Sequence, residues 1–190
     1  MILLPKDFEI TKYGVTVRLV TEDDAEFITR LRSDERLGRF IHASNGDVEA
    51  QKKWVTEYKK RENEGIEYYF IFLRDGIPYG LERIYNIDWT HLSFTSGSWL
   101  CEKGTSMEYT LLTLVIAYEI AYDMLGLKVN LFDVRKENKK VLKFHRNIMC
   151  SHQYAETELD YLFMSTPETR KNSKLKKYLG IEQSHLWLME

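Results

Sequence analysis

The chain has 190 residues, 44% of them hydrophobic and 29% charged, which is typical of one globular domain with a substantial core. Its formal net charge of −2 gives no general basic field and argues against nucleic acid as the main partner. Residues 1–5 are too short for a signal peptide, and no apolar run reaches the length that spans a membrane. We therefore expect a cytoplasmic protein whose two cysteines, Cys101 and Cys150, are reduced.

The first third of the chain predicts a strand followed by two helices. Residues 15–20 are rich in β-branched side chains and predict a short strand. Thr21 then begins a sequence typical of a capping box that closes at Asp24, which predicts the start of the first helix. The second helix is expected at about residues 48–64, where Trp54 belongs to an apolar set at helical spacing.

The middle of the chain predicts three strands and then a long helix. The strands are expected at residues 68–73, 79–86 and 91–101, and Asp75-Gly76 is a hairpin signal between the first two. A long amphipathic helix follows from about residue 106 to residue 125. It ends before Gly126, a residue type that commonly follows a helix C-terminus.

The last third predicts a strand at residues 129–134, a helix at 138–148, and a closing hairpin of strands at 153–158 and 161–165. A polar tail begins at Thr166 and ends in the apolar residues Leu186, Trp187 and Leu188. The whole order is strand, two helices, three strands, helix, strand, helix and two strands. This order predicts an α+β protein with a mixed sheet.

This order of elements, and above all the segment from Ser96 to Cys150, resembles the acetyl-CoA-binding core of the GNAT acetyltransferase superfamily. The resemblance extends over about residues 15–165. It implies the GNAT acyl-CoA N-acyltransferase fold, a mostly antiparallel central sheet flanked by helices, in one domain with residues 166–190 as a C-terminal extension. In the front half, the matching residues resemble the alanine N-acetyltransferase branch: Val17-Arg18-Leu19, Glu22-Asp23-Asp24-Ala25, Leu31-Arg32-Ser33-Asp34, Tyr69-Phe70-Ile71 and Gly80.

The turn around Gly104 is the candidate phosphate site. A glycine turn that opens a helix leaves several backbone N–H groups unpaired, with the positive end of the helix dipole behind them. The resemblance implies that this turn holds the pyrophosphate of acetyl-CoA, although the loop is shorter than the usual family pattern. The cofactor-binding residues implied here are Leu100, Cys101, Lys103, Gly104, Thr105, Ser106, Met107 and Glu108. A plain strand-to-helix turn is the alternative interpretation.

The helix at residues 138–148 supplies a second set of candidates. Asn138 matches the family residue that caps this helix and contacts the pantetheine arm, and Lys140 lies in the same first turn. His145 stands where the family often has the tyrosine that protonates the departing thiolate. An imidazolium near neutral pH could supply that proton. The alternatives are an ordinary N-cap for Asn138 and an ordinary amphipathic-helix residue for His145. The usual glycine turn after this helix is replaced by Ile148-Met149-Cys150.

Amine acetylation also needs a group that takes a proton from the acceptor, and Glu82 is the candidate general base. It follows Gly80 on a central strand, with Asp88 and His91 as further candidates, and a charge on a solvated strand face is the alternative. The histidines and cysteines lack zinc-site spacing, so no metal is expected. The chain also lacks a Gly-x-Ser-x-Gly motif and a Walker loop.

Several residues in the middle of the chain bear on the identity of the amine that accepts the acetyl group. Residues 84–88, the compact turn at 103–105 and Phe144-His145 resemble the amino-sugar nucleotide N-acetyltransferases of pseudaminic acid biosynthesis, whose acceptor is a UDP-linked 4-amino-4,6-dideoxy sugar. The 12 Tyr, 9 Phe and 4 Trp suit stacking on a sugar and its base, but core packing explains them equally well. An N-terminal protein acetyltransferase and an inactive CoA-binding protein are the alternatives, and a homodimer is compatible with the resemblance. Candidate acceptor contacts are Arg39, His42 and Trp54, although helix packing is the simpler role for Trp54.

Overall fold

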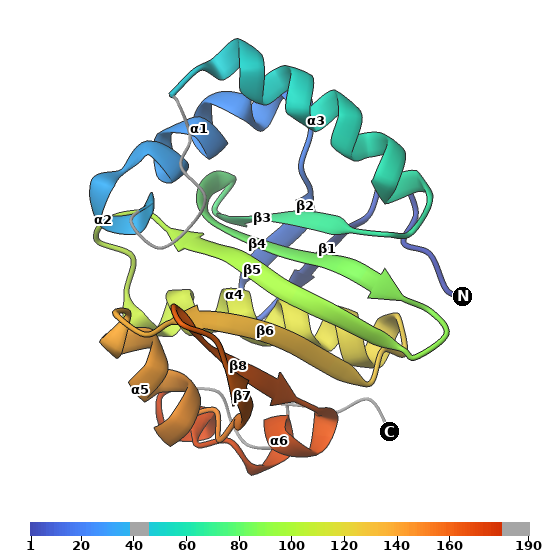
Figure 1. Ribbon diagram of the computed structural model, residues 1–190. Coiled ribbons are helices and arrows are strands. Elements are labelled where there is room, and N and C mark those ends of the chain that lie inside the picture. The colour runs from blue at the N-terminus through green and yellow to red at the C-terminus, as the bar shows by residue number, and fades with distance from the viewer. Residues whose placement is uncertain (39–45, 180–190) are drawn as a thin grey trace.

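The computed structural model describes residues 1–38 and 46–179, which form an eight-stranded sheet with helices on both faces (Figure 1). The strand order is β1-β2-β3-β4-β5-β6-β8-β7. Every neighbouring pair is antiparallel except β5 and β6, which are parallel. The predicted α+β architecture with a mixed, mostly antiparallel sheet is therefore confirmed.

The strands are β1 Glu9–Lys12, β2 Val15–Leu19, β3 Tyr68–Arg74, β4 Ile77–Asp88, β5 Ser93–Cys101, β6 Val129–Arg135, β7 His152–Glu156 and β8 Asp160–Ser165. The α-helices are α1 Ala25–Ser33, α2 Glu35–Gly38, α3 Val48–Asn63, α4 Met107–Glu119, α5 Lys139–Asn147 and α6 Pro167–Asn172, and a π-helical turn, Ile120–Met124, continues α4. The sequence analysis missed β1, α2 and α6, which are four to six residues long and carry too few residues for a periodic pattern.

The sheet separates two hydrophobic layers. Along β3, Tyr68, Phe70 and Phe72 belong to the core shared with α4. Tyr69 and Ile71 point the other way and belong to the core under α1 and α3. Because successive strand residues face opposite sides, a strand covered on both faces is apolar throughout, as β3 is.

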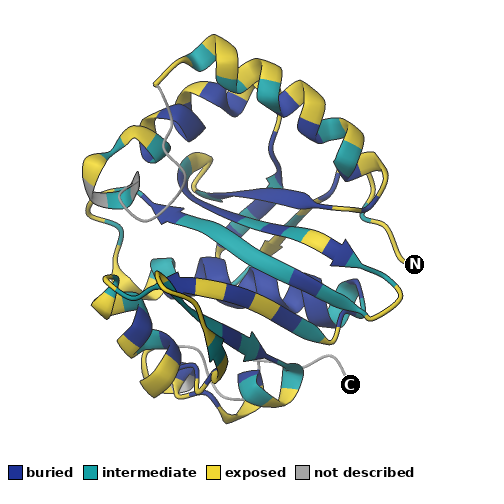
Figure 2. Cartoon of the chain, viewed as in Figure 1, coloured by how far each residue is buried: buried dark blue, intermediate teal, exposed yellow. Residues whose placement is uncertain are grey.

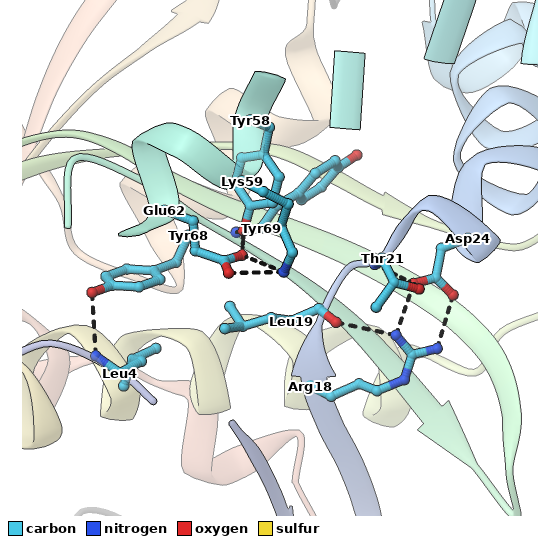
Figure 3. Close-up of polar contacts among 10 residues, drawn as sticks. All are labelled: Leu4, Arg18, Leu19, Thr21, Asp24, Tyr58, Lys59, Glu62, Tyr68 and Tyr69. Atoms are coloured by element: carbon cyan, nitrogen blue, oxygen red, sulfur yellow. Dashed lines mark hydrogen bonds and ion pairs between the residues drawn. The ribbon is translucent and has the colours of Figure 1, made fainter. Parts of the chain in front are cut away.

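The start of the first helix follows its prediction. The Asp24 carboxylate accepts hydrogen bonds from the backbone N–H of Thr21 at 2.8 Å and from Arg18 at 2.7 and 2.8 Å (Figure 3). A single-turn 3₁₀ helix, Glu22–Asp24, comes first, and α1 continues from it. This cap joins the end of β2 to the helix that covers one face of the sheet.

The long helix differs from its prediction because α4 is buried on all sides rather than amphipathic. Every residue from Leu111 to Tyr122 is buried, and Figure 2 shows the helix dark blue beneath the sheet. The C-terminal segment covers its outer side: Leu175 and Leu179 join the same core. Arg170 pairs with Asp123 through two hydrogen bonds of 2.8 Å. The start of the polar tail is thus a packed part of the domain.

The parallel pair β5 and β6 separates soon after it forms. Its register contains only Ser93 opposite Val129 and Phe94 opposite Asn130. Beyond this point the fully buried Asn130 side chain takes over the bonding. It accepts from the backbone N–H of Ser96 at 3.0 Å and donates to Ser96 Oγ at 2.9 Å and Tyr118 Oη at 3.1 Å. An amide side chain therefore replaces the backbone ladder where the sheet opens.

The turn after α5 forms without its usual glycine. Cys150 adopts a φ of 56°, which is the left-handed conformation that glycine favours. The backbone N–H of Ser151 then bonds to the carbonyl of His145 at 2.9 Å, which closes the end of the helix. The substitution by Ile148-Met149-Cys150 therefore keeps the turn, and Met149 is fully buried below it.

Candidate active site

A cleft of about 1200 Å³ lies where β5 and β6 separate. Its walls come from both sides of that opening and from the start of α5. The lining residues are Arg32, Glu35 and Leu37 near α1 and α2, Glu82, Arg83 and Tyr85 on β4, residues 96–100 on β5, Leu114 on α4, residues 132–135 on β6, and residues 137–141 and His145 around α5. The sequence candidates Glu82, Leu100, Asn138, Lys140 and His145 thus meet at one cleft.

Glu82 lies in the wall of this cleft on the α4 side of the sheet, opposite Phe70 in the strand register. It is 1% exposed, so the alternative of a charge on a solvated strand face is wrong. Within the described residues, its Oε2 atom has no hydrogen-bond partner. Burial raises the pKa of this carboxyl well above its usual range, so Glu82 tends to hold a proton until a substrate changes its surroundings.

Asp88 and His91, the other candidates for the base, form an exposed ion pair with 2.7 Å between Asp88 Oδ2 and His91 Nδ1. The same carboxylate accepts hydrogen bonds from the backbone N–H groups of Thr90 and His91 at 2.8 and 3.1 Å. Neither side chain lines the cleft. Their geometry is that of a loop-closing turn between β4 and β5.

His145 lines the cleft but is 5% exposed, and its ring lies among those of Phe132, Phe144 and Phe163 at centroid distances of 4.5, 5.2 and 6.0 Å. Burial lowers the pKa of this imidazole to about 3. The sequence argument relied on an imidazolium near neutral pH. That expectation was wrong, because a cage of apolar aromatic rings disfavours the charged imidazolium. His145 offers a neutral ring at the cleft.

Asn138 caps α5, and its side chain accepts a hydrogen bond from the backbone N–H of Val141 at 3.3 Å. It also lines the cleft, so the cap and the predicted contact with an arm of the cofactor are compatible at one residue. Lys140 is exposed beside it, next to Lys139. The start of α5 therefore brings two ammonium groups to the edge of the cleft.

The Gly104 turn has the backbone geometry that the sequence predicts. Gly104 has a φ of +92°, and a Cβ built on it would meet nothing within 4 Å. Ser106 caps α4 by accepting from the backbone N–H of Tyr109 at 3.3 Å, and Thr105 donates its N–H to the Glu102 carbonyl at 3.2 Å. Among the described residues, no partner occurs for the backbone N–H groups at positions 104, 106, 107 and 108. These four donors suit an anion.

Most of this turn lies beyond the walls of the cleft. Leu100 is a lining residue, whereas Cys101 is buried beside Gly80 of β4. Its Sγ would be 3.3 Å from a Cβ built on Gly80. Lys103, Gly104, Thr105, Ser106, Met107 and Glu108 do not line the cleft. They follow directly after the strand that forms its wall, so a ligand reaching both would extend along the end of β5.

Several lining residues were missed by the sequence analysis, and a β-bulge in β5 brings some of them to the cleft. Leu81 pairs with Leu100 but Arg83 pairs with Gly97, so β5 carries an extra residue here, and Ser98 has a φ of +54°. The Ser-Gly-Ser sequence inside the strand was an available signal for this bulge. Arg83 and Tyr85 had no such signal.

None of the three candidate acceptor contacts is found at the cleft within the described part of the chain. Trp54 does not line the cleft; its ring stacks on Tyr58 with 5.6 Å between centroids and an interplanar angle of 4°. Arg39 and His42 lie outside the described residues. The structure therefore places Trp54 in the packing of α3 against the sheet rather than in direct contact with the cleft.

Comparison with known proteins agrees with this architecture. The acetyltransferase (GNAT) domain family matches residues 15–149. FdhC, a nucleotide-linked sugar GNAT solved in its apo form, has 33% sequence identity and a TM-score of 0.79, covering 90% of this chain and 97% of that one. A comparison with curated protein sequences gives no match.

Two more distant structures share the fold. The ribosomal-protein-S5-alanine acetyltransferase of Vibrio fischeri has 14% identity and a TM-score of 0.70, covering 84% of this chain and 97% of its own. Mycobacterium smegmatis RimJ, solved with CoA-disulfide, has 17% identity and a TM-score of 0.70, covering 86% of this chain and 87% of its own.

The fold and the cleft between its diverging strands define an N-acetyltransferase. The chain belongs to the GNAT acetyltransferase family. Across residues 1–38 and 46–179, no helix is both long and apolar enough to cross a membrane.

Proposed function

We propose that this protein transfers an acetyl group from acetyl-CoA to a primary amine on a nucleotide-linked sugar, with a UDP-linked 4-amino-4,6-dideoxy sugar as the leading acceptor. The observation that carries this proposal is the 33% identity with FdhC over 90% of the chain. The ribosomal-protein acetyltransferases share only 14–17% identity, which supports a common fold alone. The cleft of about 1200 Å³ is also large enough for two substrates to meet in it.

The residues present fit acetyl-CoA. The four unpaired backbone donors at positions 104, 106, 107 and 108 would hold the pyrophosphate. Lys140 and the Asn138 cap would face the rest of the cofactor along α5. Because β5 and β6 diverge beyond Phe94, strand edges on both sides offer backbone groups to an extended ligand. The bound cofactor supplies a thioester that a neutral amine can attack.

Glu82 is proposed as the base for this attack. The amine must lose a proton as its bond to the acetyl carbon forms, and a buried carboxylate in the cleft wall can accept that proton directly or through water. Burial raises the pKa of Glu82 and so favours its protonated form, whereas a cationic amine entering the cleft would favour the carboxylate. The raised pKa also makes the carboxylate a stronger base once it has formed.

His145 is proposed to act on the departing sulfur. With a pKa of about 3 the ring is neutral, so it would donate a hydrogen bond from a ring N–H to the thiolate rather than deliver a proton as an imidazolium. The leaving sulfur carries the electron pair of the broken C–S bond and finally takes a proton from solvent. The three surrounding phenylalanine rings hold the imidazole in place for this contact.

A thiol-release assay tests the proposed function. Acetyl-CoA would be supplied with UDP- and dTDP-linked amino sugars in one set and with Ala- or Ser-starting peptides in the other. We expect a diphosphate-linked amino sugar to be acetylated at least about 100-fold faster than any peptide, because a peptide cannot make the contacts that the sugar and its diphosphate make with the site. Equal or faster turnover of peptides would assign the protein to the ribosomal-protein branch. Binding of acetyl-CoA with no thiol release from any amine would indicate an inactive CoA-binding protein.

A further inference from the structure

Arg83 lies in the cleft wall, and its guanidinium is held by aromatic rings as well as by a buried carboxylate. Its strand partner is Tyr69, which belongs to the core under α1 and α3. Arg83 therefore reaches the cleft from the face of the sheet opposite α4. The backbone N–H groups proposed to bind the pyrophosphate of acetyl-CoA are at the start of α4. Because Arg83 comes from the opposite face, it is suited to contact the second substrate rather than the cofactor.

A buried carboxylate orients this guanidinium. Glu67 comes immediately before β3, its side chain is 4% exposed, and it forms ion pairs with Arg83 Nη2 and with Arg61 Nε, the latter at 2.9 Å. One carboxylate between two guanidinium groups leaves a net positive charge at the cluster. Arg83 has five N–H donors, of which Glu67 uses one at Nη2. Its buried Nε has no partner among the described residues.

Aromatic rings hold the same group from its sides. The guanidinium carbon of Arg83 is 4.7 Å from the Tyr85 ring centroid and 5.1 Å from that of Trp54. Gly97 leaves room for Tyr85, because a Cβ there would lie 3.1 Å from the Tyr85 ring. A guanidinium stacked in this way keeps its charge and loses little further freedom when it binds a ligand.

Trp54 is itself fixed. It stacks on Tyr58, whose hydroxyl donates to Glu62 and accepts from the backbone N–H of Tyr69 at 2.7 Å (Figure 3). Lys59 completes the pairing of Glu62 at 2.8 Å. The support of Arg83 therefore comes from α3 side chains that are themselves bonded to β3, so it forms without any contribution from a ligand.

We propose that Arg83 binds the diphosphate of the acceptor and that Glu67 is a positioning residue that holds it toward the cleft. This inference rests on the proposed function and adds the residue that distinguishes a nucleotide-linked acceptor from a simple amine. A planar guanidinium matches two phosphate oxygens at once, and four of the five Arg83 N–H donors are not used by Glu67. Arg32, which also lines the cleft, adds a second positive charge near the bulge, with its Nη1 atom 3.5 Å from Ser98 Oγ.

Two acceptors that carry the same amino sugar test the proposal, one linked to UDP and one a methyl glycoside without phosphate. For Arg83→Met we expect KM for the UDP-linked acceptor, and the inhibition constant of free UDP, to rise about 10- to 100-fold, which is the value of one or two charge-assisted hydrogen bonds. The KM for acetyl-CoA, and kcat/KM for the methyl glycoside, should stay within about twofold of the unsubstituted protein.

Further variants separate positioning from folding. Arg83→Lys keeps the charge without the planar fork and should recover only part of the UDP affinity. Glu67→Gln should raise the UDP inhibition constant in the same direction by a smaller factor. Glu57→Gln, which removes an exposed carboxylate paired with Lys60 on the same helix, is the matched control and should change nothing.

The outcomes separate this inference from the proposed function. Normal turnover of the UDP-linked acceptor together with an unchanged UDP inhibition constant in Arg83→Met would overturn the role of Arg83 alone. An equal loss with both acceptors would also overturn it, by showing a purely structural role. If the unsubstituted protein acetylated no diphosphate-linked amino sugar, the proposed function and this inference would fall together.

Discussion

Two titratable side chains in the same cleft are shifted in opposite directions by the same cause. Burial disfavours charge, so it raises the pKa of the Glu82 carboxyl and lowers that of the His145 imidazole. Burial thus favours the neutral form of both groups, and the His145 imidazole, with a pKa of about 3, is neutral near pH 7. Groups with shifted pKa values cluster at functional sites, which is one reason to test these two residues first.

Glu82 should make stability fall as pH rises. Its pKa is higher in the folded than in the unfolded protein, so above the unfolded value of about 4.3 the unfolded state holds fewer protons, and unfolding becomes easier. In Glu82→Gln this slope should disappear, which makes the variant relatively more stable at pH 8 than at pH 5. Thermal unfolding at both pH values checks this.

The same variant tests catalysis. We expect Glu82→Gln to lower kcat by about 100-fold near neutral pH, the usual contribution of a general base. The loss should shrink as pH rises, because more of the acceptor amine is then already neutral. A kcat close to that of the unsubstituted protein at all pH values would contradict the role of Glu82.

His145 should have the opposite effect on stability. Its folded pKa of about 3 lies below the ordinary value of 6.5, so its contribution is complete above pH 6.5 and is lost as pH falls toward 3. His145→Phe should lose less stability between these values, by on the order of a few kcal/mol. Acid titration of unfolding checks this, and an unchanged acid transition would show that folding does not lower the pKa of the imidazole.

His145→Phe also keeps the aromatic packing while it removes the ring N–H. We expect kcat to fall about 10- to 100-fold with the Kd for acetyl-CoA nearly unchanged. His145→Tyr, which restores a donor and the residue usual in the family, should recover much of the rate. An unchanged kcat in His145→Phe would show that the imidazole N–H does not assist the departing sulfur.

At the scale of elements, the site depends on how strands and helices end. Asn138 starts α5 at the cleft, and the Gly104 turn starts α4 beside it. The bulge at Ser98 and the amide of Asn130 open the sheet between them. Each of these features lies where regular backbone hydrogen bonding stops, and together they leave space for a ligand between β5 and β6.

Gly104 and Gly14 form a matched pair for testing the turn. Both are exposed, have φ values of +92° and +72°, and a Cβ on either would meet nothing within 4 Å. Gly104→Ala and Gly14→Ala should therefore each cost about 1–2 kcal/mol of stability through backbone strain. Only Gly104→Ala should weaken acetyl-CoA binding, by about tenfold, because its donors are reoriented. Calorimetry of both variants checks this, and equal affinities would show that the turn binds no phosphate.

For the whole molecule, the cleft divides the sheet into strands β1 to β5 on one side and β6, β8 and β7 on the other. The strands bordering the cleft share only a short ladder, so few backbone bonds join the two halves there. A ligand bound between them would add contacts that the protein alone lacks. Ligand binding and global stability should therefore be linked.

Acetyl-CoA at about 100 times its Kd should stabilise the fold by about 2.7 kcal/mol, a rise in Tm of about 5–10 °C for a domain of this size. Pantetheine, which lacks the pyrophosphate, should give a smaller rise at the same concentration. A thermal shift assay checks both ligands. No shift with acetyl-CoA at millimolar concentration would contradict the placement of its site.

Local sequence was sufficient for most of the elements. The apolar run of β3, the Asp75-Gly76 turn, the Asn138 cap and the glycine after the long helix each act over a few residues, so they can be read along the chain. The family resemblance added the acetyltransferase function and the proximity of Glu82, Asn138 and His145. It did so because the order of elements determines which strands and helices become neighbours.

Other properties depended on contacts between distant residues, which no local pattern encodes. His145 is neutral because Phe132 and Phe163 come from other elements to surround it. Arg83 is oriented by Glu67 and by Trp54, which is 29 positions earlier in the chain. Whether a side chain is charged, and how it is oriented, depends on the residues that pack against it. Only the folded chain brings those residues together.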